Sequence, residues 1–276
     1  MRKLFCEISP FTYKISTYKE RALHYLRNFP AKERFAASFA APLPIIVHRH
    51  KSLIRRRLGN VDLRLQDNKA INLSIAAPKI SGVLIHPGET FSFWKLVGSC
   101  TKAKGYKEGL TITGTAATKG IGGGMCQLSN LLHWLVLHSP LEITEHHHHD
   151  NFDLFPDFKR QVPFGVGTSI LYNYIDYRVQ NNTAQTFQFI VCTSDEYLHG
   201  ELRSSEALAQ SYHIRKEDEY FYEKDGQFFR HNKVYRVIVD TRSGDTLSKK
   251  LIQECNALVL YDSAQINKDL LRSSDE

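Results

Sequence analysis

The sequence has few cysteines and no long hydrophobic run. Its five cysteines are an odd number, are widely spaced and include no CxxC pair, so neither a disulfide framework nor a structural zinc site is indicated. No stretch reaches the roughly 18–20 uninterrupted apolar residues that a membrane span needs. The apolar segment 35–47 contains two prolines and lies too far inside the chain for a signal peptide. We therefore expect a soluble protein on the cytoplasmic side.

The composition is that of a globular protein, but its charge is unevenly distributed. Hydrophobic residues make up 42% and charged residues 24% of the 276 residues, which excludes a wholly disordered or fibrous chain. The net charge is +7, yet residues 1–60 hold 13 basic and 3 acidic residues, a local balance of +10. This segment favours peripheral contact with an anionic membrane or with precursor phosphates, and a solvated helix face is the ordinary alternative. No motif for nucleic-acid binding accompanies it.

Apolar spacing and turn residues predict an α+β fold in three parts. Residues 1–66 are expected to form a basic helical N-terminal segment with a helix over 18–29. Residues 67–205 are expected to form a core domain, in which a buried helix packs on a mostly antiparallel sheet. Residues 206–276 are expected to form a β-hairpin-rich extension, because two turn signals, Asp225-Gly226 and Ser243-Gly244-Asp245, separate strand-like runs.

Within the core domain, a helix over residues 126–138 is the clearest expectation. Its apolar residues recur three and four apart, which leaves Cys126, Asn130 and His133 on another face. A second helix is expected from Asp67 or Asn68 to Ile75. Residues 90–94 are strand-like and aromatic, and one short strand, 110–113, fits into the glycine-rich region 98–124.

The motif richest in chemistry is Gly122-Gly123-Gly124-Met125-Cys126-Gln127, where a loop becomes a helix. Consecutive glycines indicate a close approach or a positive φ. A cysteine in the first helical turn meets the positive end of the helix dipole, which favours the thiolate, and free amides there can hold an oxyanion. Cys126 is therefore a candidate nucleophile. The alternative is a small buried residue at a tightly packed helix start.

Four consecutive histidines, His146 to His149, follow a predicted strand over 141–145. In extended chain His147 and His149 share one face, and His146 and His148 share the other. Three interpretations are open: a base for Cys126, a metal site with Cys126 or Asp150, or a surface patch. We predict no bound metal and no cofactor.

Together these segments resemble the VanW family. The resemblance covers roughly residues 68–203. It rests on Asn72, the HisProGlyGluThrPheSerPheTrp stretch (86–94), Gly105-Tyr106, the GlyGlyGlyMetCysGlnLeuSerAsn stretch (122–130), and the segments 145–149, 165–170 and 181–183.

The resemblance also carries over individual positions. It assigns Gly123, Gly124, Cys126 and Gln127 to the family's glycine–cysteine turn, and Glu145, His147 and His149 to its histidine segment. Two positions depart from the family pattern, because His146 stands where arginine is usual and Gly167 where many members carry aspartate. If that aspartate orients the histidine, a substitute is needed here, with Asp150, Asp153 and Asp176 as candidates.

The resemblance implies an association with glycopeptide resistance and the cell envelope, without an established activity. We expect an accessory or ligand-binding protein, with Phe93, Trp94, Gly123, Gly124 and Glu145 at a site for a peptidoglycan precursor or cell-wall peptide. Aromatic residues at such positions also suit a core strand.

The alternative is a thiol hydrolase or acyltransferase acting on a cell-wall peptide amide. In that case Cys126 attacks, His149 or His147 accepts the proton, and Gln127 adds a donor for the oxyanion.

Overall fold

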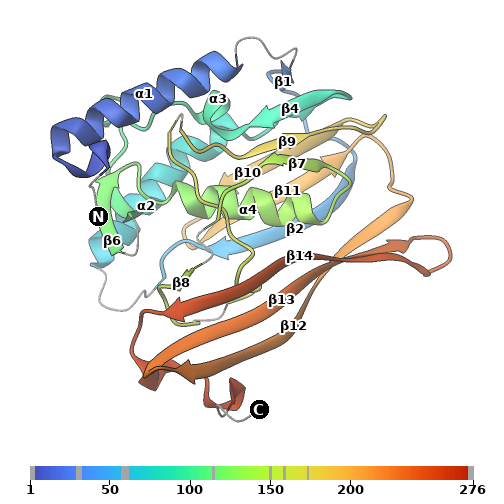
Figure 1. Ribbon diagram of the computed structural model, residues 1–276. Coiled ribbons are helices and arrows are strands. Elements are labelled where there is room, and N and C mark those ends of the chain that lie inside the picture. Colours follow the sequence, from blue (N-terminus) through green and yellow to red (C-terminus); the bar gives the residue numbers. More distant parts are fainter. Residues whose placement is uncertain are drawn as a thin grey trace.

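The helix predicted over residues 126–138 is present as α4, Met125–Leu137, and lies in the middle of the molecule (Figure 1). The computed structural model describes residues 4–28, 33–56, 62–113, 116–148, 151–157, 160–172 and 174–272. Within these ranges the fold is α+β with mostly antiparallel sheets, which confirms the predicted class. The apolar residues expected on the core face of α4 are all buried: Leu128, Leu131, Leu132, Leu135 and Val136.

One four-stranded antiparallel sheet supports α4. Its order is β2 (Ile45–Leu53), β11 (Tyr197–Ser204), β10 (Phe187–Thr193) and β3 (Leu84–Ile85). The helix contacts the backbone of β11 at Gly200, where a Cβ atom would lie 2.8 Å from Leu131 Cδ2 and 3.0 Å from Leu135 Cδ1. The core cluster includes buried residues of this sheet, of α4 and of α2 (Leu63–Ala76).

A second sheet contributes to the same core. Its order is β1 (Arg34–Phe35), β4 (Glu89–Ser92), β9 (Arg178–Gln180) and β7 (Glu142–Glu145), with only the β1–β4 pair parallel. The strand predicted over 90–94 ends at Ser92, because Ser92 caps the short helix α3 (Phe93–Val97) by accepting from Lys95 N. Buried Asp176 fixes this boundary by accepting from Ser92 Oγ at 2.5 Å and from Trp94 N at 3.0 Å.

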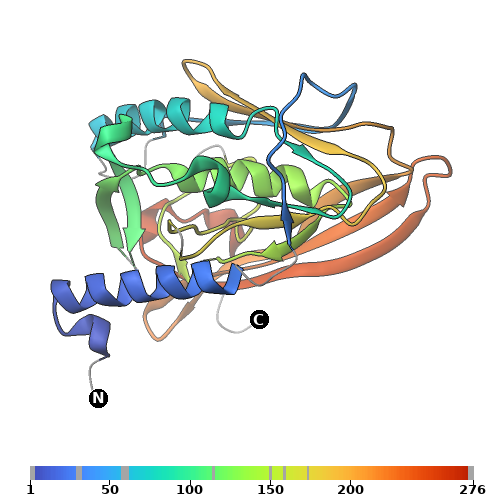
Figure 2. The same ribbon diagram turned by 90° about the horizontal axis from the view of Figure 1, so that it is seen from above.

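The N-terminal segment is only partly helical. Helix α1, Pro10–Asn28, begins earlier than predicted, since Ser9 Oγ accepts from Thr12 N and proline suits the first helical position. Residues 45–53 form strand β2, so the prediction of a helical segment is wrong there; β-branched residues and a partner strand favour the extended form. Figure 2 shows α1 lying along the outside of the body. None of the helices in the described ranges has the length and apolar character of a bilayer span.

Two further predictions need correction. Helix α2 is capped by Asp62, whose side chain accepts from Arg64 N, and not by Asp67 or Asn68. The glycine-rich region holds two strands and not one, because β5 (Glu108–Thr113) pairs with β6 (Ala116–Ile121) as an antiparallel hairpin. Small residues of β6 gave no strand signal in the sequence, and its pairing with β5 stabilises it.

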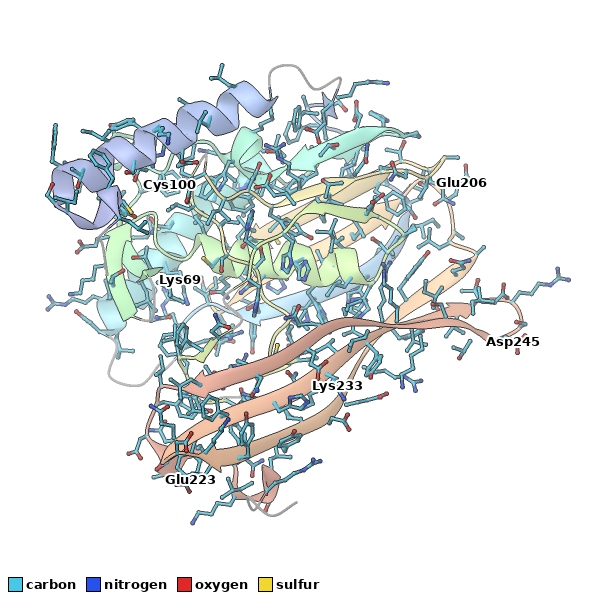
Figure 3. All side chains as sticks on the ribbon, in the orientation of Figure 1. Lys69, Cys100, Glu206, Glu223, Lys233 and Asp245 are labelled. Atoms are coloured by element: carbon cyan, nitrogen blue, oxygen red, sulfur yellow. The ribbon has the colours of Figure 1, made fainter. Side chains whose placement is uncertain are left out.

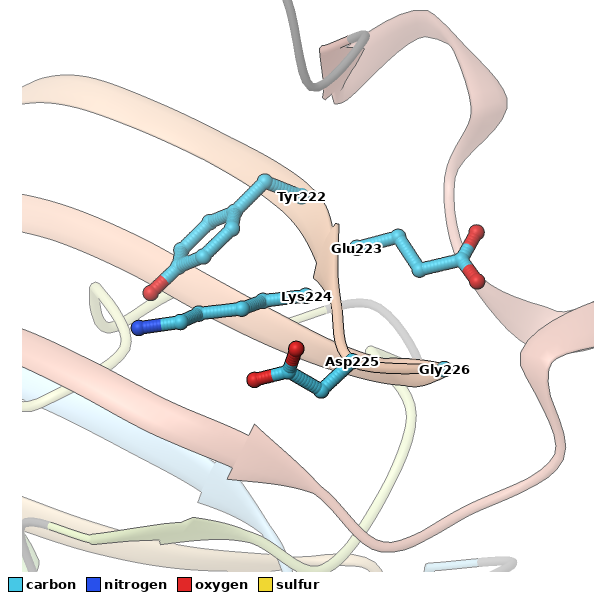
Figure 4. A pocket seen from close by; sticks show the side chains of 5 residues that line it. All are labelled: Tyr222, Glu223, Lys224, Asp225 and Gly226. Carbon is cyan, nitrogen blue, oxygen red and sulfur yellow. The ribbon is translucent and has the colours of Figure 1, made fainter.

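The C-terminal hairpins form a third sheet. Its order is β15 (Leu271–Arg272), β12 (Gln210–Lys224), β13 (Gln227–Asp240), β14 (Thr246–Val259) and β8 (Phe152–Asp153). Both predicted hairpin turns are present, and Asp225 and Gly226 have φ angles of 52° and 72°. An open hollow at that turn is lined by Tyr222, Glu223, Lys224, Asp225 and Gly226 (Figure 4). It lies on a different sheet from the glycine–cysteine turn.

Candidate glycine–cysteine site

The three consecutive glycines are required because each lies against another part of the chain. A Cβ atom on Gly122 would lie 2.3 Å from Cys100 Cβ, and one on Gly124 would lie 2.3 Å from Lys69 Cγ. A Cβ atom on Gly123 would lie 2.3 Å from the carbonyl carbon of Gly109 on β5. Gly122 and Gly124 also have φ angles of 80° and 104°, where side chains are disfavoured. The three glycines thus allow this turn to pack closely against β5, Cys100 and Lys69.

Asn72 on α2 holds this turn in place. Its Nδ2 donates to Gly123 O at 2.9 Å and to Lys107 O at 3.0 Å, and its Oδ1 accepts from Lys107 N at 2.7 Å. The residue is fully buried, so these bonds satisfy polar backbone groups that water does not reach. Asn72 therefore joins α2, the approach to β5 and the start of α4.

Cys126 is in the first turn of α4, as predicted, and its side chain is partly buried. Burial raises the pKa of the thiol above its ordinary value. The backbone N–H groups of Ile170 and of Cys126 itself lower this pKa by less. Desolvation of the sulfur therefore outweighs these two backbone hydrogen bonds, and the raised pKa favours the protonated thiol at neutral pH.

Gln127, the predicted oxyanion donor, faces strand β2. Its Nε2 donates to Ser52 Oγ at 2.9 Å and to Leu53 O at 2.9 Å. Both amide hydrogens are used in this way. Gln127 thus ties the first turn of α4 to the end of β2.

Two of the four histidines face α4. The ring of His146 stacks on His133 with centroids 4.4 Å apart, and His146 Nε2 lies 2.8 Å from Gly167 O. The ring of His148 lies beside Gly167, where a Cβ atom would be 3.0 Å from His148 Nε2. Burial lowers the pKa of His133 well below its usual value, so that imidazole is neutral. The structure therefore brings His146 and His148, but not His147, towards this face.

The two histidines predicted to act with Cys126 are placed differently. His147 is exposed, and its Nε2 lies 3.3 Å from Glu145 Oε1. His149 lies outside the described residues, as does Asp150, one of the candidates to orient a histidine. The catalytic role of His147 and His149 stays a prediction.

The other candidate aspartates are engaged elsewhere. Asp176 accepts from Ser92, Trp94 N, Tyr177 N and Arg178 Nε. Asp153 pairs with Arg230 at 3.0 Å and accepts from Tyr261. These partners include no histidine of the described ranges, so neither aspartate orients one there.

The residues predicted to bind a ligand mostly support the fold. Phe93 and Trp94 are buried core residues on α3, and Trp94 Nε1 donates to Ile175 O at 3.0 Å. Glu145 accepts from Asp176 N at 2.8 Å and pairs with Arg178 at 3.2 Å. The described part of the chain contains no group of three or more His, Cys, Asp or Glu side chains placed to hold a metal ion.

The sequence reasoning missed two polar residues beside this turn, Gln66 and Lys69 on α2. Both are buried, with 1% and 6% of their surface exposed. Their spacing of three residues places them on one face of the helix. That spacing is the only signal the sequence offers, since lysine and glutamine are normally exposed.

Comparisons with known proteins agree on one family. The family model described as "VanW like protein" matches residues 68–203. The chain is 34% identical over 219 residues to the vancomycin B-type resistance protein VanW of Enterococcus faecalis (strain ATCC 700802 / V583), covering 79% of each chain. It is 32% identical over 121 residues to the uncharacterized protein YoaR of Bacillus subtilis (strain 168), covering 43% of this chain and 37% of that one. No solved structure matches.

Replacing Gly123 by alanine is expected to destabilise the protein severely. The new Cβ atom would overlap the backbone of Gly109, which cannot move without shifting β5. We expect a loss of about 3 kcal/mol or more in the free energy of unfolding, measured by denaturant titration. Gly88→Ala is the control, because Gly88 has a φ of 77° but nothing within 4 Å of its Cβ position; it should cost only about 1–2 kcal/mol. Equal losses for the two variants would contradict the proposed backbone contact.

The thiol of Cys126 is expected to react slowly at neutral pH. Its raised pKa leaves little thiolate there, and the rate should increase only as the pH passes the ordinary thiol pKa of about 8.5. Alkylation rates resolved by site with mass spectrometry provide the measurement. Cys192, which is exposed, is the internal reference. Faster labelling of Cys126 than of Cys192 below pH 7 would show that the thiol is activated.

Proposed function

This chain belongs to the VanW family, and from that premise we propose that it is an accessory protein of vancomycin B-type resistance without turnover of its own. It would bind a cell-wall precursor at the cytoplasmic face of the membrane. The relative that is 34% identical over 79% of each chain is named for vancomycin B-type resistance, and this likeness supports the biological assignment.

The proposed contact with the membrane is supported by an apolar stripe on the outer face of α1. Phe11, Ile15, Tyr18 and Leu26 are exposed by 70%, 41%, 68% and 60%. At 100° per residue these positions fall on one side of the helix. The short helix before α1 adds exposed Phe5. A soluble surface helix normally turns such a stripe inward.

The half-buried residues of α1 lie to one side of the stripe and are mostly polar, while Tyr13, on the side opposite the stripe, is 52% exposed. Thr12, Ser16 and Glu20 are half-buried, together with one apolar residue, Leu23. The Arg21 side chain attaches the helix to the body, since its Nε donates to the carbonyl oxygen of residue 172 at 3.2 Å. The apolar stripe is therefore turned away from the body, and it has no cover among the described residues.

The charge around the stripe fits an anionic lipid surface. Lys14 and Lys19 are exposed and lie on the two sides of the stripe, where their stems can follow the apolar surface while the ammonium groups reach phosphate headgroups. The balance of +10 in residues 1–60 has the same sign. The cytoplasmic leaflet is the anionic one, which supports the proposed side of the membrane.

A thiol-hydrolase role has no specific support. Burial keeps the Cys126 thiol protonated, and His146 and His133 are stacked on each other with hydrogen-bond partners of their own. We therefore propose the accessory role without turnover and not the hydrolase role.

Removal of two aromatic residues from the apolar stripe is expected to weaken membrane binding strongly. The double variant Phe11→Ser, Tyr18→Ser should bind phosphatidylglycerol-containing vesicles at least tenfold more weakly than the unmodified protein in flotation, because each aromatic ring buries apolar area worth about 1.5–3 kcal/mol when fully covered. Pure phosphatidylcholine vesicles should bind either protein weakly. The control Phe39→Ser, Leu247→Ser removes two other exposed apolar residues away from α1 and should bind normally.

Analytical ultracentrifugation separates this proposal from self-association. If the unmodified protein is a dimer and the α1 variant a monomer, with vesicle binding unchanged, then a second copy covers the stripe and the membrane role is wrong.

Replacement of the cysteine tests the accessory role. Cys126→Ser should retain the full effect on vancomycin resistance, measured as the inhibitory concentration in cells that depend on this protein for it. The substitution is small and the thiol is not activated, so the folded protein should differ little. A complete loss of resistance in a variant with an unchanged melting temperature would establish a chemical role for the sulfur.

A further inference from the structure

Two buried donors of α2 meet the beginning of α4. The stem of Lys69 lies against Gly124, the capping residue of α4. Lys69 is labelled in Figure 3. Gln66 precedes it by three residues on the same helix face, and its Nε2 is buried without a hydrogen-bond partner. Gln66 Nε2 therefore lacks an acceptor within the described chain, and the Lys69 stem brings a second donor group to the same helix face.

Arg56 adds a guanidinium to the same place. Its backbone N–H donates to Gln66 Oε1 at 3.2 Å, and its Nη2 donates to Ser52 Oγ at 3.1 Å. Ser52 Oγ also accepts from Gln127 in the first turn of α4. Arg56 is thus linked through Ser52 to the helix start that Lys69 contacts through Gly124.

The acidic side chains nearby do not neutralise these two cations. Asp67 pairs with Arg55 at 2.7 Å at the exposed edge of the group, and Asp157 pairs with Arg160. No described carboxylate pairs with Lys69 or Arg56. Burial, followed by the charges of Arg56 and Arg55, lowers the pKa of Lys69 to about 7. Burial, followed by the charge of Arg160, lowers the pKa of Arg56.

The helix start adds a further positive potential. Gly124 offers no side chain to cap α4, and no side-chain hydrogen bond replaces one. The first amides of a helix lack intrahelical acceptors, and its N-terminus carries a partial positive charge. Lys69, Arg56, Gln66 Nε2 and these amides are all donors. An anion with several oxygens can accept from more than one such donor and balance their positive charge.

We propose that Lys69, Arg56, Gln66 and the first turn of α4 bind a phosphate group of the ligand. Two cations without a described carboxylate partner match a dianion better than a carboxylate with a single charge. Arg55, whose charge acts on Lys69, has a side chain that is 48% exposed. The phosphate site itself does not depend on the proposed function. Only the identity of the molecule that carries the phosphate does, and under the proposed function it is a precursor with a diphosphate link.

Titration calorimetry with four probes tests the site: inorganic phosphate, diphosphate, a nucleoside diphosphate sugar and acetate. The unmodified protein should bind the three phosphate compounds and bind acetate at least tenfold more weakly. Lys69→Met and Gln66→Glu should each weaken phosphate binding at least tenfold. Gln66→Glu is isosteric and places a carboxylate among the donors, where it competes with the ligand. Lys102→Met removes one exposed lysine outside the site and should leave binding unchanged.

A second measurement guards against misfolded variants. Without phosphate, Lys69→Met and Gln66→Glu should melt at the same temperature as the unmodified protein or higher, because they remove or pair a buried charge. Phosphate should raise the melting temperature of the unmodified protein and of Lys102→Met only.

Several results would overturn the site. These are no binding of any phosphate compound, equal affinity for acetate, or unchanged binding in folded Lys69→Met. Tighter binding of the nucleoside diphosphate sugar than of free diphosphate would identify a precursor as the source of the phosphate, whereas equal binding would assign the site to free phosphate compounds. If vesicle flotation fails while phosphate binding depends on Lys69, the membrane role is lost and the phosphate site stands.

Discussion

The contact between the backbones of Gly123 and Gly109 determines where α4 begins. Because neither residue has a Cβ atom, the glycine turn lies directly against β5, and Asn72 on α2 donates to Gly123 O. The helix start is therefore fixed between α2 and the β5–β6 hairpin. From there α4 runs over β11, where Gly200 allows a second close contact. Two glycine contacts thus fix the start of the helix and the strand on which it packs.

The same dense packing has opposite consequences for the two reactive side chains at the turn. Burial disfavours the charged form of any group. For Cys126 the charged form is the nucleophile, so burial suppresses its reactivity. For Lys69 the charged form is the anion ligand, and burial near Arg56 leaves it with an unmet need for a counter-charge. On this argument, the motif that first suggested thiol chemistry is better suited to the anion site that we propose.

Local patterns in the sequence predicted the elements that depend on local chemistry. The apolar spacing of α4 and the Asp225-Gly226 turn are examples, since periodicity and positive φ are properties of a few neighbouring residues. The boundary at Ser92 could not be predicted, because the carboxylate that fixes it belongs to Asp176, 84 positions away. The burial of Lys69 was hidden for a similar reason. Its neighbours Gly124 and Arg56 come from other elements, and composition alone assigns a lysine to the surface.

The proposed ligand rests on two features of this protein, the stripe on α1 and the group around Lys69. The stripe on α1 lacks an apolar cover among the described residues, and the group around Lys69 lacks an anion. Each feature taken alone fits several partners: a protein could cover the stripe, and a free ion could bind the cations. An anionic amphiphile is the simplest single environment that supplies both, with acyl chains for the stripe and phosphate for the donors. A cell-wall precursor held by a lipid diphosphate in an anionic leaflet has this composition, and the proposed accessory role therefore needs no reaction at Cys126.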